Sequence, residues 1–272
     1  MDSKRERILS IRNLDVSFRT TAGSVHALRG VDLDLYLGET VAVVGESGSG
    51  KSVTMKAVMG ILDRNGTVDS GEILFSYEDG GRKKSVDILK LTKKQIRRTI
   101  NGQHIAMVFQ DPMTSLDPTM AIGKQIMEGM LLHKRMTRQE AWDRAVELLS
   151  IAGIPEPEKR MKNYPHQLSG GMRQRVVIAI ALALNPDVLI CDEPTTALDV
   201  TIQAKILELI RDIQRRTGVS VLYITHDLGV VAKVADYVNV MYAGRIVEKG
   251  SIDDIFYDPR HPYTWGLLSA MP

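Results

Sequence analysis

Four short runs of apolar and β-branched residues have the pattern of strands buried within a parallel sheet. The runs are Thr40–Val44, Ile105–Phe109, Val188–Cys191 and Val219–Thr225. A strand covered by helices on both faces is apolar throughout, and each run is shorter than an ordinary helix. A segment that can form a helix, Lys51–Leu62, follows the first run. Buried strands that alternate with helices predict an α/β protein.

The first third of the chain also contains a different kind of strand. Ile8–Leu14 and Val31–Leu35 alternate apolar and polar residues, which is typical of half-exposed antiparallel strands. A further short strand is predicted at Glu72–Phe75, between turns at Asp63–Gly66 and Asp69–Gly71. We therefore expect an antiparallel β portion beside the parallel sheet.

The middle of the chain has a helical pattern. Between about Ile122 and Met161, a capping box at Thr137–Glu140 precedes apolar residues at helical spacing, and Gly153 ends that helix. A second helix is predicted from Leu168 to a stop at Asn185–Pro186. The first of these segments indicates a helical insertion within the α/β protein.

One stretch fits the phosphate-binding pattern G-x-x-x-x-G-K-[ST] at every fixed position, in the required order of strand, loop and helix. Glycines let successive backbone N–H groups face a phosphate, Lys51 supplies a cation, and the Ser52 hydroxyl suits Mg²⁺. The pattern predicts an ATP site. The residues assigned to the nucleotide here are Gly45, Glu46, Ser47, Gly48, Ser49, Gly50, Lys51, Ser52 and Val53.

Polar residues follow the other buried strands. Gln110 comes after the second run, Asp192 and Glu193 end the third, and His226 follows the fourth. Ligands of open α/β sheets bind at the carboxyl ends of the strands, so we expect these side chains to meet near the phosphates. Asp192 is suited to hold Mg²⁺, and Glu193 is suited to polarise an attacking water as general base.

A second anion-binding element is predicted where a helix begins at Leu168–Met172. Ser169 is a good N-cap, and Gly170 and Gly171 leave backbone N–H groups uncovered at the positive end of the helix dipole. Taken together, these strand ends and loops predict a nucleotide hydrolase.

Composition excludes several other classes of protein. The 272 residues allow one large or two modest domains, and their net charge of +2 gives no reason to expect nucleic acid. The basic stretches Gly80–Lys84 and Lys93–Arg98 are interpreted as a solvated face. No apolar run reaches the roughly 18 residues of a membrane span, and no signal peptide is recognised. The single Cys191, predicted to be a small buried hydrophobe, excludes internal disulfides and indicates a cytosolic protein.

These motifs, in this order, resemble the ATP-binding cassette (ABC) subunits over nearly the whole chain. Gly45–Ser52 resembles the Walker A loop, and Leu168–Met172 the LSGGQ signature with methionine as its last residue instead of glutamine. The other matches are the Q-loop Gln110, the Walker B strand Val188–Glu193, the D-loop Ala197–Asp199, the switch His226, and Phe18 near the aromatic that stacks on adenine.

Further segments resemble the oligopeptide/dipeptide importer subunits. They are Phe109–Pro118, Tyr164–Gln167 and His261–Thr264, while Leu131–Lys134 and Lys159–Lys162 favour the oligopeptide D-type group. Members of this group usually continue into a tail whose cysteines can hold an iron–sulfur cluster. Because the chain stops at Pro272, we expect a truncated chain or a variant without that cluster. Cys191 alone could not hold one.

The resemblance implies a fold with a RecA-like P-loop NTPase core, an antiparallel β subdomain and an inserted α-helical subdomain. It implies a core of residues 1–111 and 165–257, a helical insertion at 112–164, and the start of a C-terminal extension at 258–272.

It also implies a site shared between two subunits, which bind two ATP molecules head to tail. Lys51 of one subunit meets Ser169, Gly170 and Gly171 of the other, with Asp199 linking the sites. The catalytic residues implied are Glu193, His226, Lys51 and Gln110, and the Mg²⁺ ligands are Ser52, Gln110 and Asp192.

The implied partners are a second ABC ATPase subunit, two membrane permease subunits and, indirectly, an extracytoplasmic peptide-binding protein, at the cytoplasmic face of the membrane. Three alternatives stay open: an importer of nickel or another solute, a non-transport ABC ATPase acting on DNA or ribosomes, and a subunit that binds ATP without hydrolysing it.

Overall fold

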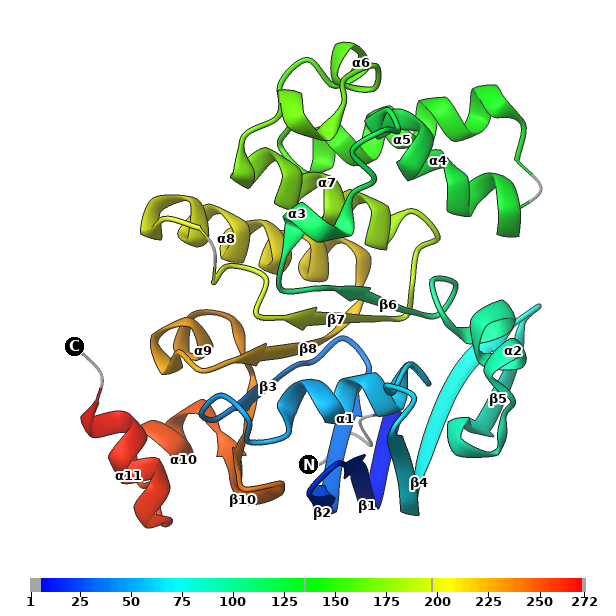
Figure 1. The fold of residues 1–272 in the computed structure, drawn as a ribbon. Coiled ribbons are helices and arrows are strands. Elements are labelled where there is room, and N and C mark those ends of the chain that lie inside the picture. The colour runs from blue at the N-terminus through cyan, green and yellow to red at the C-terminus, as the bar shows by residue number, and fades with distance from the viewer. Residues whose placement is uncertain (1–5, 135, 197, 271–272) are drawn as a thin grey trace. The chain divides into compact units, whose positions relative to one another are not determined.

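The computed structural model describes residues 6–134, 136–196 and 198–270. Figure 1 shows the ribbon of the chain, whose contacts divide it into two compact units. The first unit contains the described residues up to Thr99 and those from Gly218 onward, and the second contains Ile100–Thr217. The first unit is thus built from both ends of the chain.

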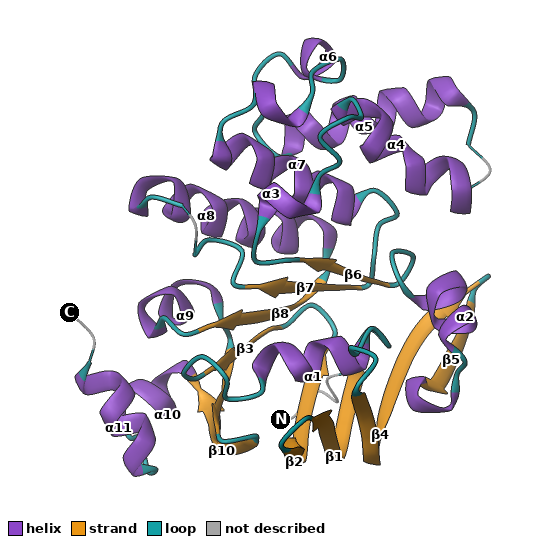
Figure 2. Cartoon of the chain, in the orientation of Figure 1, coloured by secondary structure: helices purple, strands orange, loops and turns teal. Residues whose placement is uncertain are grey.

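The antiparallel portion of the first unit is a sheet with the strand order β2-β1-β4-β5 (Figure 2). Its strands are β1 (Arg7–Thr20), β2 (Gly23–Tyr36), β4 (Gly66–Asp79) and β5 (Arg82–Asp87). The two alternating segments predicted as antiparallel strands lie in β1 and β2, which pair with each other. That prediction is confirmed.

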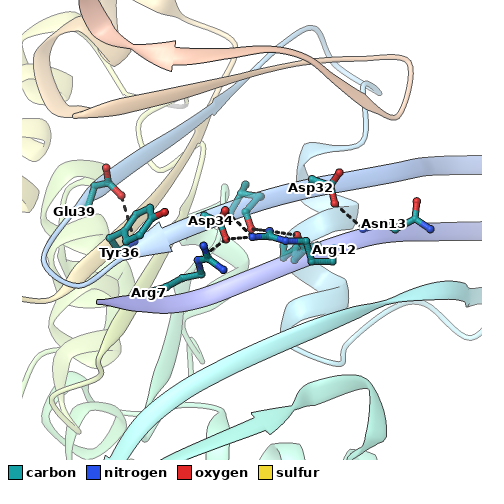
Figure 3. Close-up of polar contacts among 9 residues, drawn as sticks. Arg7, Arg12, Asn13, Asp32, Asp34, Tyr36 and Glu39 are labelled. Atoms are coloured by element: carbon teal, nitrogen blue, oxygen red, sulfur yellow. Dashed lines mark hydrogen bonds and ion pairs between the residues drawn. The ribbon is translucent and has the colours of Figure 1, made fainter. Parts of the chain in front are cut away.

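Charged residues join β1 to β2 along one part of this pair (Figure 3). The Arg12 guanidinium donates to both carboxylate oxygens of Asp34, at 2.7 and 2.8 Å, and Arg7 Nε lies 3.0 Å from Asp34 Oδ1. The backbone N–H of Asn13 donates to Asp32 Oδ1 at 2.8 Å. These contacts help fix the register of the strand that leads towards β3.

The predicted turn at Asp69–Gly71 is wrong, because these residues lie inside β4. Gly71 has φ +114°, and a Cβ at this position would lie 2.7 Å from the Cα of Leu14. The pairing of β1 with β4 shifts register between Arg12 and Asp15. The glycine therefore serves a bulge where the two backbones approach closely, and the strand continues through it.

The parallel portion of the first unit has the strand order β10-β9-β3-β8. These strands are β3 (Thr40–Val44), β8 (Ser220–Thr225), β9 (Tyr237–Tyr242) and β10 (Arg245–Ser251). Strand β3 pairs in parallel with β8 and β9, and β10 pairs antiparallel with β9. Every residue of β3 and β8 is buried, as predicted for strands covered on both faces.

Short helices complete the first unit. They are α1 (Lys51–Val58), a 3₁₀ turn (Ile88–Lys90), α2 (Lys93–Gln95), a π turn that begins at Ile96, α9 (Leu228–Val234), α10 (Ile252–Tyr257) and α11 (Pro262–Ser269). The predicted extension of the first helix to Leu62 is wrong, because it ends at Val58 and Gly60 turns the chain with φ +64°. Residues of α9 and α10 form a core cluster with β3 and β9, and Leu267 and Leu268 of α11 pack against it.

The second unit contains two parallel strands, β6 (Ile105–Val108) and β7 (Val188–Asp192), and is otherwise mainly helical. Its helices are α3 (Pro112–Ser115), α4 (Ile122–His133), α5 (Arg138–Ile151), α6 (Pro157–Arg160), a 3₁₀ turn (Pro165–Gln167), α7 (Gly170–Leu182) and α8 (Val200–Thr217). The predicted capping box is confirmed at the start of α5. Helix α7 ends three residues before the predicted stop at Asn185, because Leu182 is its last helical residue.

The basic segment of β5 lies on the surface. Its Lys83 and Lys84 are exposed and lie 2.8 and 2.5 Å from carboxylate oxygens of Glu6 and Asp79, respectively.

Across the described residues, every helix is either too short or too polar to traverse a lipid bilayer.

Candidate nucleotide site

The predicted phosphate loop connects β3 to α1 in the first unit. Residues Gly45–Gly50 follow the last residue of the buried strand, and Lys51 is the first residue of the helix. Gly50 precedes that helix in a left-handed conformation, with φ +112°. The strand, loop and helix expected from the sequence are therefore present in this order.

Two of the loop glycines are required by what lies against them. A Cβ at position 45 would lie 2.1 Å from the carbonyl oxygen of Met241, and one at position 50 would lie 2.8 Å from side-chain atoms of Leu28 and Met241. The loop backbone therefore packs directly on β9 and β2. Gly48 faces open space and has φ +79°, so its role is conformational.

Lys51 is held inside the loop although its side chain is charged. Its Nζ donates to the carbonyl oxygens of Gly45 at 2.7 Å and Glu46 at 2.8 Å, and only 4% of the residue is exposed. The N–H of Ser49 donates to the same Glu46 carbonyl at 3.2 Å. The loop carbonyls thus enclose the Lys51 ammonium, and this arrangement places a positive charge at the positive end of the α1 dipole.

The loop residues fit a phosphate group. The Ser49 hydroxyl oxygen is buried and has no hydrogen-bond partner within the part of the chain that the structure describes. A buried polar group without a partner costs about 1–3 kcal/mol, so such groups favour a ligand that satisfies them. Ser52 and Val53 follow Lys51 and are half-buried. An enclosed lysine, glycines without room for side chains and an unsatisfied hydroxyl together form a cradle for a polyphosphate.

His226 lies at the same sheet edge as the phosphate loop. Strands β3 and β8 are parallel neighbours in which Val44 pairs with Thr225, so Gly45 and His226 each follow one member of that pair. The next residue, Asp227, fixes the chain by accepting from Gly229 N at 2.8 Å as the cap of α9. The predicted convergence is confirmed for these two strand ends.

The second unit brings Gln110 and Glu193 together. Val108 of β6 pairs with Cys191 of β7, and just past these strand ends Gln110 Nε2 donates to Glu193 Oε2 at 3.2 Å. Asp192, the last residue of β7, is buried. Two carboxylates and an amide therefore lie at one end of the β6–β7 pair.

Glu193 has a second polar contact that the sequence did not suggest. The Thr196 hydroxyl donates to Glu193 Oε2 at 3.0 Å, the oxygen that Gln110 also contacts. A hydroxyl residue three positions after a strand-end carboxylate is a weak signal, because Thr and Ser are common in any turn. Thr196 is therefore a residue of this site that the sequence motifs do not indicate.

The buried thiol beside this pair does not take part in its chemistry. Cys191 is fully buried in β7. Burial, together with the neighbouring Asp192, raises the pKa of the thiol far above its ordinary value. The prediction that Cys191 is a small buried hydrophobe is confirmed.

The signature segment caps α7 as predicted. Ser169 Oγ accepts from Met172 N at 3.3 Å, so the methionine takes part through its backbone. A Cβ at Gly171 would lie 2.7 Å from Ile202 of α8, which explains the need for glycine there. Ser169 and Gly170 are exposed. These residues therefore present an uncovered helix start to the surroundings.

For two further predicted site residues, Asp199 and Phe18, the structure shows contacts with nearby backbone. Asp199 is exposed and its Oδ1 accepts from Ile202 N at 2.9 Å, at the start of α8. Ala197 of the predicted D-loop lies outside the described residues. Phe18 lies in β1 opposite Gly66, where a Cβ would lie 2.7 Å from the Phe18 ring. Its stacking on adenine stays a prediction.

Comparison with known proteins agrees with this site. Residues 28–196 match the ABC transporter family, and residues 247–272 match the oligopeptide/dipeptide transporter C-terminal region. The chain is 57% identical to the oligopeptide transport ATP-binding protein OppD of Bacillus subtilis, over 98% of this chain and 72% of OppD. It is 55% identical to the dipeptide transport ATP-binding protein DppD of Lactococcus lactis, over 98% of this chain and 74% of that protein.

Solved structures agree on the fold. The chain is similar to the ATP-binding cassette MJ0796 in a dimeric post-hydrolysis state bound to ADP and Pi, with a TM-score of 0.76 and 27% identity over 90% of this chain and 99% of that one. It is also similar to cbiO1 from Clostridium perfringens, part of the ABC transporter complex cbiONQ, with a TM-score of 0.76 and 30% identity over 93% of this chain and 92% of that one. The predicted RecA-like α/β fold is confirmed. The chain therefore belongs to the ABC transporter family, within the group of its ATP-binding proteins that carry the oligopeptide/dipeptide transporter C-terminal region.

Proposed function

We propose that this chain is the ATP-binding and ATP-hydrolysing subunit of an importer that takes up oligopeptides or dipeptides through separate permease subunits. The observation that carries the ATPase part is the phosphate loop, in which Lys51 is enclosed by loop carbonyls at the sheet edge it shares with His226. The peptide part is supported by the relatives, whose names describe oligopeptide and dipeptide transport.

Each side chain has a proposed role in binding ATP. The loop N–H groups and Lys51 bind the phosphates, His226 contacts the γ-phosphate, and Phe18 stacks on the base. A Mg²⁺ ion, when bound, neutralises charge on the phosphate oxygens. We assign Ser52, Asp192 and the side-chain oxygen of Gln110 to it, because Gln110 Nε2 already donates to Glu193.

Glu193 is proposed as the residue that orients and polarises the attacking water. Its Oε2 accepts from Gln110 Nε2 and from the Thr196 hydroxyl, and these contacts orient the carboxylate. An oriented carboxylate that accepts the proton of an attacking nucleophile contributes about 10²–10⁴-fold to the rate.

The complete site is proposed to need a second ABC ATPase subunit. Ser169, Gly170 and Gly171 would contact the phosphates bound by the partner, and Asp199 would link the two sites. The exposure of Ser169 and Gly170 supports this arrangement, because an uncovered helix start can reach a neighbouring subunit. The similar cassette solved as a dimer with ADP and Pi also supports it.

The helical segment 112–164 is proposed to transmit closure of the two subunits to the permease, within a core of 1–111 and 165–257, with 258–272 starting a C-terminal extension. The chain is then a peripheral protein on the cytoplasmic face of the membrane. Peptide would contact the permease and an extracytoplasmic binding protein, and no nucleic acid is involved.

The direct test is ATP binding by a Lys51→Ala variant. Removing the Lys51 ammonium should raise the Kd for ATP at least about 100-fold. The variant loses its charge-assisted hydrogen bonds to the phosphates, and such bonds are among the strongest in proteins. The matched control is Lys56→Ala on the same helix, which removes an ion pair of 3.5 Å with Asp63 and should leave the Kd unchanged. Wild-type affinity in Lys51→Ala would contradict the loop assignment.

The solute is tested separately. The complex of this chain with the products of neighbouring genes should co-purify with a bound peptide, which mass spectrometry would identify. A complex that carries a nickel chelate or another non-peptide solute would contradict the peptide assignment while leaving the ATPase assignment intact.

A further inference from the structure

The phosphate loop is contacted by a residue from the far end of the chain. The hydroxyl oxygen of Tyr263 accepts a hydrogen bond from the backbone N–H of Glu46 at 2.9 Å, across 217 positions of sequence. The carbonyl oxygen of Glu46 accepts from Lys51 Nζ and from Ser49 N. Tyr263 is therefore hydrogen-bonded to the N–H group of the residue whose carbonyl oxygen binds Lys51.

Two kinds of contact fix the Tyr263 ring. It packs against the core cluster formed by β3, α9, β9 and α10. Its centroid lies 4.4 Å from that of Tyr242, with the rings tilted by 40°. Partial burial raises the pKa of Tyr263 above its ordinary value despite the Glu46 hydrogen bond, so the hydroxyl is neutral at physiological pH. A neutral phenol whose ring is held by such packing presents its oxygen in one place.

Glu248 of β10 fixes the backbone that carries Tyr263. Its carboxylate accepts from the N–H groups of Arg260 at 2.6 Å and His261 at 3.1 Å, and from the hydroxyl of Thr264, which is fully buried. His261 in turn caps the helix, since its Nδ1 accepts from Tyr263 N at 3.1 Å. The first turn of α11 is thereby attached to β10 through one carboxylate.

We propose that Tyr263 is a positioning residue of the phosphate loop and that Glu248 positions Tyr263 by attaching α11 to the sheet. This inference depends on the proposed role of the Gly45–Ser52 loop in binding ATP. A loop rich in glycine loses much conformational freedom when it closes on a phosphate. A hydroxyl that fixes the Glu46 peptide in advance lowers that cost, and the gain appears as affinity.

The test compares two tyrosines of the same aromatic pair in the full chain. Tyr263→Phe keeps the ring and removes the hydroxyl from Glu46, whereas Tyr242→Phe removes a hydroxyl from the neighbouring ring. A typical hydrogen bond corresponds to about 3- to 10-fold in affinity, so the Kd for ATP should rise by that factor in Tyr263→Phe and stay within about twofold in Tyr242→Phe.

Kinetics separate positioning from general stability. With the partner subunit present, Tyr263→Phe should raise the KM for ATP and leave kcat unchanged, because the contact is made before and during the reaction. A wild-type Kd for Tyr263→Phe, alongside lost binding in Lys51→Ala, would overturn this inference alone. Unchanged binding in Lys51→Ala would instead overturn the proposed function of the loop.

The role of Glu248 is tested by combining substitutions. Glu248→Gln should raise the Kd for ATP in the wild-type background and have no further effect in the Tyr263→Phe background, because both changes act through one hydroxyl. Equal increases in the two backgrounds would overturn the claim that Glu248 acts through Tyr263.

Discussion

At the scale of single residues, Glu193 of the candidate site has a backbone conformation that its residue type disfavours. Its φ of +46° lies in the left-handed region, which costs a non-glycine residue of order 1–3 kcal/mol. The contacts from Gln110 and Thr196 to one carboxylate oxygen accompany this conformation. A strained, oriented carboxylate at a strand end matches the proposed role in activating water.

Replacing Glu193 by Gln should keep the shape of the site and remove the base. We expect ATP binding to persist, hydrolysis to fall at least about 100-fold, and an ATP-bound dimer to accumulate, as measured by phosphate release and size-exclusion chromatography. Glu158→Gln on the exposed surface of α6 is the matched control and should hydrolyse ATP normally. Normal hydrolysis by Glu193→Gln would remove Glu193 as the base.

A second prediction at the residue scale concerns the glycines of the phosphate loop. Gly45→Ala places a methyl group 2.1 Å from the Met241 carbonyl, so strand and loop must separate, and both the Tm and ATP affinity should fall. Gly129→Ala in α4 puts the same methyl in ordinary contact with Leu184, at 3.8 Å, and should leave ATP affinity unchanged. Calorimetry and nucleotide titration measure both effects. An unaffected Gly45→Ala protein would contradict the packing described.

At the scale of elements, the predictions that the structure confirms come from patterns among neighbouring residues. The Thr137 capping box, the Ser169 cap and the buried strand β3 depend on neighbouring residues, and the structure contains all three. The sequence does not predict the length of β4, because residues between 66 and 70 pair with β1, which lies more than 40 positions away, and the bulge at Gly71 resembles a turn. Pairing between distant strands leaves no comparable local pattern.

The two helix caps distinguish a structural role from a functional one. Thr137→Ala and Ser169→Ala should each lower the free energy of unfolding by about 1 kcal/mol, because each removes an N-cap side chain. Only Ser169→Ala should also reduce ATP hydrolysis in the assembled pair of subunits. Chemical denaturation and ATPase assays of both variants test this, and equal ATPase activity would count against Ser169 as part of the shared site.

The attachment of α11 should be sensitive to acid. Burial raises the pKa of Glu248, but the hydrogen bonds from Thr264, Arg260 and His261 outweigh it and the pKa is lowered overall. A carboxylate with a lowered folded-state pKa stabilises the fold above its ordinary pKa, about 4.3, and this stabilisation is lost as pH falls through the folded-state value.

Trp265 of α11 reports on that attachment, since its Nε1 donates to Pro259 O at 2.6 Å. In a Trp142→Phe background, its fluorescence should change as pH falls from about 4, and Glu248→Gln should largely remove the change. An identical pH profile in the Glu248→Gln variant would show that another group is responsible.

At the scale of the whole molecule, the sequence predicted the fold class and two pairs of site residues that the structure brings together. Gly45 and His226 follow paired residues at the ends of β3 and β8, and Gln110 contacts Glu193 just past the ends of β6 and β7, because parallel strands align their carboxyl ends. The sequence indicates Tyr263 only as part of the segment His261–Thr264 that resembles the importer subunits. Its contact with Glu46 depends on how α11 packs, which no spacing in the chain encodes.

In the assembled transporter, ATP hydrolysis by this chain is proposed to drive peptide import. The most direct measurement is ATP-dependent uptake of a labelled peptide into vesicles that contain the complete complex, with either wild-type chain or Glu193→Gln. We predict that peptide accumulates only with ATP and the wild-type chain. Equal accumulation with Glu193→Gln, or without ATP, would contradict the claim.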